Sequence, residues 1–398
     1  FVFPFSLGLL MQGSALEITW AIVSAIAGLT AISAALVGYL FRPLNVVFRV
    51  VLFVAGFSAM LSPFGTVFSE AFNFVGLIGG LTISAHAETV ALATDKQGTT
   101  FNTVGSAVAK VASSNSDLNI IVRPYAGPAA WAPIVNSGEV PFGMMSASSA
   151  YRAFSGDNET NEAFHNLRII RAGGSSLMLG LAVRDDGPIK TYADLKGKRI
   201  SSDFGGHLSI SNSLTASLGL AGYTWDDVTP VPVTGANDGI DALVADRLDA
   251  TWASVGQPRA READTQIGIR YLSVPEDSNA QQVFQEAVFP GARLAVAQDG
   301  IAPGIDGDTR VLSYDSYLVS SKEASDTAIT QMLQALWDNN EELFGVHPSL
   351  RGFTNENAVT DAPVMPYHPA AAAFYKEKGV WTDADQERQD ALMGEAGE

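Results

Sequence analysis

The chain has 398 residues, enough for two or three domains, and no cysteine, which excludes disulfides, thiolate metal sites and a cysteine nucleophile. Its formal net charge is −18, and the only Asp, Glu, Lys or Arg residues before position 88 are Glu17, Arg42, Arg49 and Glu70, so the acidity belongs to residues 88–398. A neutral apolar segment followed by an acidic one indicates that the first part lies in a membrane and the second in water. The acidic charge argues against a nucleic-acid partner.

Two transmembrane helices are predicted in the first part of the chain. Residues 18–41 carry no charged side chain and exceed the ~20 residues that a spanning helix needs. Residues 45–61 follow a short polar link and can form a second, antiparallel span. Both arginines lie at or near that link, which favours a cytoplasmic position for it.

Residues 64–84 contain Glu70 and Asn73 and only a short apolar core, so an interfacial helix or linker is expected there. The alternative is a third span, which would leave the acidic domain in the cytoplasm. The next residues, Ala85-His86-Ala87, match the pattern that signal peptidase cuts, but the positive residues of a signal peptide are missing before them. We therefore expect a joint within one chain, and cleavage after Ala87 stays open. Because the sequence starts at Phe1 rather than Met, a missing amino-terminal part is also expected.

From Thr89 onward, short strands alternate with helical stretches, a pattern that predicts an α/β domain with largely parallel sheets. The first helix begins at Thr99 or Thr100 and places Val104 and Val108 on its apolar face. The predicted strands are residues 89–94, 118–125, 140–146, 167–174, 176–184, 198–203, 228–234, 248–254, 269–274 and 310–321.

A strand, a glycine turn and a helix start occur twice, first around Gly98 and again after residue 198. In the second case Thr191 and Asp194 form a capping box before the strand, and Ser209 is expected to cap the helix after it. One such turn in each half of the domain indicates two lobes that face each other across a cleft. Helix amino termini there favour a small anion such as a carboxylate.

No catalytic site, metal site or cofactor is expected. The five histidines lack metal-ligand spacing, and His347 and His368 each precede a proline at a helix start, which indicates a structural role. Neither the G-x-S-x-G nor the G-x-x-x-x-G-K-[ST] motif occurs. An enzyme on this fold is therefore the weakest alternative.

Both parts of the chain resemble one transport system. Residues 1–60, notably "GYLFRPLN", resemble the carboxy-terminal end of the fused membrane subunit of tripartite ATP-independent periplasmic (TRAP) transporters. Residues 90–381 resemble the TAXI family of TRAP-associated solute-binding proteins. The fragments that carry this second resemblance are "GTTFNTVGSAVAKV", "VPFGMMSASSAYRAF", "LRIIRA", "DLKGKRI", "FGVHPSLRGF" and "PYHPAAAAFYKEKGVW".

The resemblance implies a two-lobed, periplasmic-binding-protein-like (type II) domain after the transmembrane segment of residues 1–87. Lobe 1 would comprise about 88–184 and 316–398 and lobe 2 about 185–315, with a hinge near 182–187 and 314–320. The domain would lie in the periplasm at the inner membrane, close around a dicarboxylate, 2-oxo acid or glutamate-like anion, and deliver it to sodium-driven TRAP membrane subunits. The alternatives are a membrane-tethered sensory module and a free secreted binding protein.

Nine residues are predicted to contact the anion. Hydroxyls at helix starts can bind a carboxylate, although plain capping is the alternative. The two aromatic residues could flank the ligand or pack in the core, and the histidine stands where the family has a serine. The candidates are Gly98, Thr99, Thr100, Phe101, Tyr125, Ser146, His207, Ser209 and Gln257.

Overall fold

The computed structural model describes residues 88–397 except 159, 277 and 278, together with a few helical residues of the preceding segment: Ala15, Ile18, Thr19, Ile22, Ile26, Leu29, Thr30, Ile32, Ser33, Leu36 and Phe53. The chain forms two compact units, Phe1–Ala87 and Glu88–Glu398. In the first unit, the Thr19 and Thr30 hydroxyls donate to the carbonyls of Ala15 and Ile26, each at 2.8 Å. Most of the predicted spans at 18–41 and 45–61, and all of 64–84, lie outside the described residues. Within the part of the chain that is described, none of the helices combines the length and the apolar character needed to cross a membrane.

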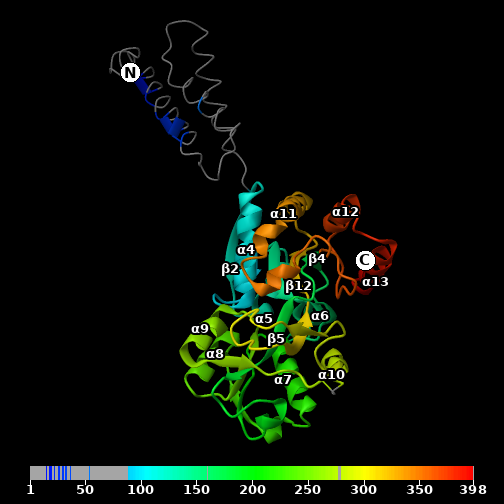
Figure 1. Cartoon of the computed structure of the whole chain (residues 1–398). Helices are drawn as coiled ribbons and strands as arrows, with labels where there is room; N and C mark the ends of the chain where they lie inside the picture. Colours follow the sequence, from blue (N-terminus) through cyan, green and yellow to red (C-terminus); the bar gives the residue numbers. More distant parts are fainter. Residues whose placement is uncertain are drawn as a thin grey trace. The chain divides into compact units, whose positions relative to one another are not determined.

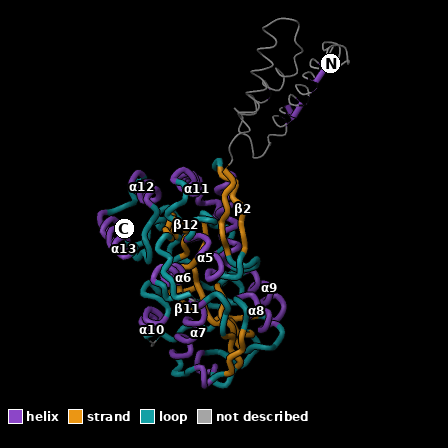
Figure 2. The backbone as a smooth tube through the Cα atoms, turned by 180° about the vertical axis from the view of Figure 1, so that it is seen from behind, coloured by secondary structure: helices purple, strands orange, loops and turns teal. Residues whose placement is uncertain are grey.

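The first lobe of the second unit is built on a five-stranded sheet in the order β2-β1-β3-β12-β4. Three of its strands, β2, β12 and β4, are labelled in Figure 1. Its strands are β1 (Glu88–Thr94), β2 (Leu118–Pro124), β3 (Phe142–Ser146), β4 (Leu167–Ala172) and β12 (Ser316–Ser321). The helices of this lobe are α4 (Thr100–Ser114), α5 (Pro128–Asn136), α6 (Ala147–Ser155), α11 (Asp326–Asp338), η4 (Asn340–Leu343), η5 (Pro348–Gly352), α12 (Pro369–Glu377) and α13 (Asp383–Glu395). Both α12 and α13, which end the chain, lie beside this lobe (Figure 2).

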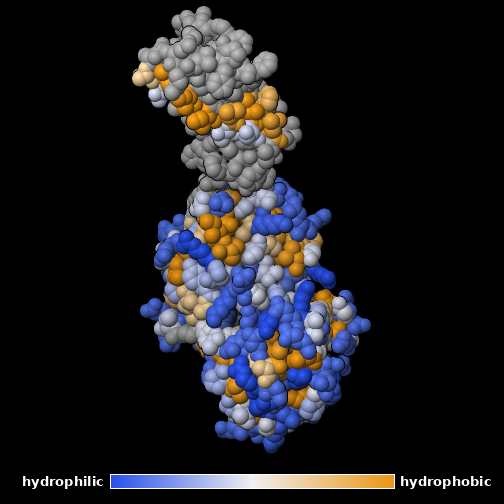
Figure 3. All heavy atoms as spheres, turned by 90° about the vertical axis from the view of Figure 1, so that its left-hand side faces the viewer, coloured by the Kyte–Doolittle hydropathy of each residue, from blue (hydrophilic) through white to orange (hydrophobic). Residues whose placement is uncertain are grey.

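The second lobe is built on a seven-stranded sheet in the order β10-β11-β5-β8-β6-β7, with β9 paired to β5. Its strands are β5 (Leu177–Arg184), β6 (Arg199–Ser202), β7 (Thr229–Pro232), β8 (Ala250–Ser254), β9 (Ile269–Tyr271), β10 (Arg293–Ala297) and β11 (Thr309–Tyr314). Its helices are η2 (Tyr192–Leu195), α7 (Leu208–Leu220), η3 (Trp225–Asp227), α8 (Ala236–Val244), α9 (Pro258–Ile267) and α10 (Ala280–Ala287). The visible surface of this unit is mainly hydrophilic (Figure 3), as its acidic composition leads one to expect.

The chain crosses between the lobes twice. It passes from β4 to β5 through residues 173–176 and returns through Asp315, between β11 and β12. The predicted first crossing at 182–187 is wrong, because β5 pairs with β8, β9 and β11 of the second sheet. Lobe 1 therefore ends before Leu177. The second crossing falls within the predicted range of 314–320.

The sheets are mixed, so the prediction of largely parallel sheets is also wrong. Strands β1, β2 and β3 run parallel, as do β6, β7 and β8. In contrast, β12 is antiparallel to both β3 and β4, and β5 is antiparallel to all three of its neighbours. Parallel neighbours are usually joined by a helical crossover within one lobe, whereas β12 enters the first sheet only after the chain has returned from the second lobe and pairs antiparallel to β3 and β4.

Local signals set most element boundaries. Each predicted strand range contains a strand, and the run 310–321 is divided into two at Asp315. The edge strand β10 was not predicted, since only Ala297 of its residues is buried. Thr99 caps α4 and the Thr191–Asp194 capping box is present, as predicted. Ser209 is not a cap, because α7 begins at Leu208 and its N-cap residue is His207.

Candidate ligand-binding cavity between the two lobes

A cavity of about 50 Å³ lies where the two lobes meet, at the carboxyl ends of β1, β3 and β8. One ordered water needs roughly 10–15 Å³ on this scale, so the space suits a small molecule. In an open α/β fold, this edge of the sheet is the usual place for a ligand.

Six helices begin at this cavity, three from each lobe. The lining includes Thr99 and Thr100 at α4, Pro128 at α5, Ser146 at α6, His207 at α7, Ala236 at α8 and Gln257 at α9. A helix amino terminus has unpaired N–H groups and a partial charge of roughly +0.5. The first residues of α5, α7, α8 and α9 receive no side-chain cap. The described lining contains no Lys or Arg, so the helix ends are its main source of positive potential.

Seven of the nine predicted contact residues line this cavity: Thr99, Thr100, Phe101, Ser146, His207, Ser209 and Gln257. Their contact with a ligand stays a prediction. The other two lie outside the lining. Gly98 has a φ of +83° and faces the second lobe, where an added Cβ would lie 3.2 Å from Asn237 Nδ2. Tyr125 packs against the first-lobe core and donates its backbone N–H to the Thr94 carbonyl at 2.8 Å.

A chain of hydrogen bonds joins the lobes on one side of the cavity. The hydroxyls of Thr100 in α4 and Ser254 in β8 lie 2.7 Å apart. The Gln257 amide oxygen accepts from Ser254, while its Nε2 donates to Asn237 Oδ1 at 2.9 Å. Asn237 in turn donates to the carbonyl of Gln97 in the first lobe at 2.9 Å. The second-lobe amides are therefore held in fixed orientations.

The lobes also touch on the other side. Ser146 Oγ caps α6 by accepting from Ser149 N at 3.0 Å, and the Ser149 hydroxyl lies 3.5 Å from that of Ser209 in α7. The His207 ring lies against Gly127, where an added Cβ would be 2.6 Å from Nε2. A side chain at Gly127 would require the His207 ring to shift, and its Cβ would also lie 3.0 Å from the Gly206 carbonyl oxygen.

Arg152 of α6 reaches across to the second lobe. It is only 5% exposed, and its Nη2 donates to the carbonyl of Val288, after α10, at 2.9 Å. The same guanidinium pairs with Asp157 in its own lobe. This buried cation thus joins the lobes beside the cavity.

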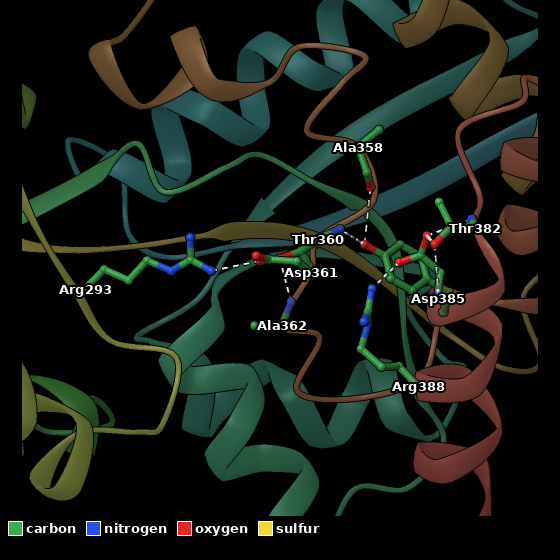
Figure 4. Close-up of polar contacts among 9 residues, drawn as sticks. Arg293, Ala358, Thr360, Asp361, Ala362, Thr382, Asp385 and Arg388 are labelled. Atoms are coloured by element: carbon green, nitrogen blue, oxygen red, sulfur yellow. Dashed lines mark hydrogen bonds and ion pairs between the residues drawn. The ribbon is translucent and has the colours of Figure 1, made fainter.

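Polar side chains also meet at the hinge. A second cavity, of about 290 Å³, is bordered by both crossing segments and by Arg293 and Asp361. Figure 4 shows Arg293 of β10 reaching Asp361 of the first lobe, at 2.8 Å. Ser175 donates to Asp315 at 2.9 Å, which joins the two crossings to each other.

Polar lining residues outside the nine candidates include Asp95, Ser149 and Ser254. Asp95 directly follows β1 and is 4% exposed, and Trp131 Nε1 donates to its Oδ1 at 3.2 Å. Burial raises the pKa of Asp95, while His207 and the Trp131 hydrogen bond lower it by less. The signal that could have found Asp95 was its place just beyond a strand's carboxyl end.

The structural role predicted for His347 and His368 is confirmed. Each is an N-cap residue whose Nδ1 accepts from a backbone N–H, that of Ser349 at 3.1 Å and that of Ala370 at 3.2 Å. Burial lowers the pKa of His347 to about 4, with Arg261 adding to the effect. Within the described residues, no group of three or more His, Cys, Asp or Glu is placed to hold a metal ion.

Two sheets joined by two crossings, with a cavity between them, define the two-lobed mixed α/β fold of this unit. More particularly, residues 92–379 match the NMT1-like family, and the chain belongs to that family.

Solved structures similar to this chain include the periplasmic aliphatic sulphonate binding protein SsuA from Escherichia coli, which is 16% identical with a TM-score of 0.40 over 76% of this chain and 97% of that one. MatC from Rhodopseudomonas palustris with bound malate is 13% identical, with a TM-score of 0.47 over 77% and 99%. These likenesses are too distant to indicate the ligand of this chain.

Proposed function

We propose that this chain is a solute-binding protein, not an enzyme, and that its two lobes close around a small organic anion. The observation that carries the proposal is the convergence of six helix amino termini on one small cavity whose described lining has no Lys or Arg. Backbone N–H groups at helix starts bind carboxylates without side-chain cations. The ligand class is a dicarboxylate, a 2-oxo acid or a glutamate-like acid.

Binding works through a shift between open and closed lobes. A ligand that contacts both lobes stabilises the closed arrangement, because it gains contacts there that the open arrangement lacks. The hydroxyl pair Thr100–Ser254 and the Arg152–Val288 contact belong to the closed arrangement. The hinge consists of residues 173–176 and Asp315.

We further propose that the domain serves a sodium-driven TRAP transporter as a TAXI-type receptor in the periplasm. The sequence resemblances of residues 90–381 and 1–60 support this assignment. The same reasoning makes residues 1–87 the membrane tail of the transporter, with spans at about 18–41 and 45–61, and residues 88–398 the receptor. Its partners are then the ligand and the TRAP membrane subunits.

A melting series on the full chain tests ligand binding. Dicarboxylates, 2-oxo acids, 2-hydroxy acids and amino acids are added one at a time, each at several concentrations. A ligand present at 100 times its dissociation constant stabilises the folded state by ~2.7 kcal/mol. A melting temperature that stays constant across the whole panel would contradict the ligand class.

The mass of the mature protein tests the domain assignment separately. A protein isolated with its membrane fraction and longer than residues 88–398 supports the tail. A product that starts at Glu88 means cleavage after Ala87 and removes the membrane anchor from the proposal, while the ligand-binding function remains.

A further inference from the structure

Asp95 is the only carboxyl group among the described residues that line the cavity. It is 4% exposed, and the only hydrogen bond that its carboxyl group receives within the described part of the chain comes from Trp131 Nε1, at 3.2 Å. A carboxylate has about four acceptor positions. Most of the hydrogen-bonding capacity of Asp95 is therefore unused by the protein.

The surroundings do not compensate for this shortage. The other titratable groups in the described lining are His207 and Tyr314, and no ion pair joins Asp95 to His207 among these residues. Burial raises the pKa of Asp95 more than His207 and Trp131 lower it, as expected for a carboxyl group with too few donors.

A ligand that fills the cavity lies next to Asp95. The space of about 50 Å³ holds only a few volumes of roughly 10–15 Å³, each that of one ordered water, so a small acid bound there occupies most of it and leaves little room for water in front of the carboxyl group. An oxo group placed against Asp95 would set acceptor against acceptor. A hydroxyl or an ammonium group would donate to Asp95. An analogue without such a donor would leave the buried carboxylate unpaired, and that cost makes a site discriminate strongly between the two ligands.

We propose that Asp95 is the specificity-determining residue of the cavity, selecting organic acids that carry a hydroxyl or ammonium group over oxo acids with the same carbon skeleton. The ligand carboxylate faces the helix amino termini and its donor group faces Asp95. This inference rests on the proposed function and, within its ligand class, favours hydroxy dicarboxylates and glutamate-like amino acids over 2-oxo acids.

Calorimetric titration of the full chain at constant pH tests the proposal with three matched sets. These are lactate, alanine and pyruvate; malate, aspartate and oxaloacetate; and 2-hydroxyglutarate, glutamate and 2-oxoglutarate. In the set that binds, the hydroxy or amino acid is expected to bind at least tenfold more tightly than the oxo acid. Comparison within the set tells whether the donor is a hydroxyl or an ammonium group.

The variant Asp95→Asn keeps an oxygen for Trp131 and adds an amide donor, so it is expected to reduce the preference below about threefold or to reverse it. The control Asp203→Asn removes an exposed carboxylate that does not line the cavity, and it should leave the preference unchanged. The wild-type comparison stands even if a variant fails to fold.

Each outcome has a distinct meaning. If an oxo acid binds the wild type as tightly as its partners, the proposal on Asp95 is overturned while the proposed function stands. Tight oxo-acid binding that weakens as pH rises would mean that a protonated Asp95 donates, which also overturns it. If none of the nine acids binds, the proposed ligand class falls and the inference with it.

Discussion

The clearest test of lobe closure is the substitution Arg152→Met. The Arg152 guanidinium is buried and donates to Val288 O in the other lobe at 2.9 Å, with Ala287 O at 3.4 Å. A hydrogen bond to a charged group contributes about 1.5–3 kcal/mol. The ion pair with Asp157 adds little, because that carboxylate is 65% exposed. Methionine keeps the apolar stem and removes the contact between the lobes.

If the free protein is mainly open, the lost closing energy appears directly as lost affinity. Because each 1.4 kcal/mol changes the dissociation constant tenfold, the dissociation constant of Arg152→Met should rise by roughly 10- to 150-fold. Calorimetry measures this rise, and small-angle scattering should show a larger radius of gyration at saturating wild-type ligand concentration. The control is Arg199→Met, because Arg199 binds Asp246 and Asp249 within the second lobe. Unchanged affinity in Arg152→Met, with Arg199→Met also unchanged, would refute the reasoning.

Two further predictions concern stability. Burial lowers the pKa of His347 to about 4 in the folded protein, so folding favours its neutral form, and stability on the order of 3 kcal/mol should be lost as pH falls from about 6.5 to 4. His347→Asn keeps an acceptor for the helix cap but cannot take up the proton, so denaturant titrations at several pH values should show a smaller loss. Gly143→Ala would bring a Cβ to 2.4 Å from a Trp131 ring carbon and should lower the free energy of unfolding by about 1–3 kcal/mol. Gly219→Ala, with nothing within 4 Å of the added Cβ, should raise it by about 0.4–1 kcal/mol. Equal denaturation midpoints for the two variants would contradict the packing argument.

The sequence predicts the helix starts well, because their signals are local. Thr99 and Ser146 accept hydrogen bonds from N–H groups three residues ahead, and such pairs are visible in any short window. Since these caps stand at strand ends, seven of the nine candidate residues meet at one cavity. The prediction of Ser209 as a cap failed by only two positions, as the turn after β6 brings His207 to that place.

Long-range contacts are what the sequence could not predict. The partner of Thr100 is Ser254, 154 residues away, and Asp95 becomes important only because Trp131 and the second lobe bury it. The lobe boundary was misplaced for a related reason. Residues 177–184 form a mostly buried run that would suit either sheet, and only its pairing with β8 and β11 assigns it to the second lobe.

The most direct test of the central claim is to fill the cavity. Ala236 begins α8, is half-buried and lines the cavity, while Ala245 at the other end of the same helix is exposed and lies outside the lining. Calorimetric titration of the full chain with the acid selected in the melting series should show one site in the wild type and in Ala245→Phe, and no binding in a folded Ala236→Phe. Equal affinity in all three proteins would contradict the claim that the ligand binds in this cavity.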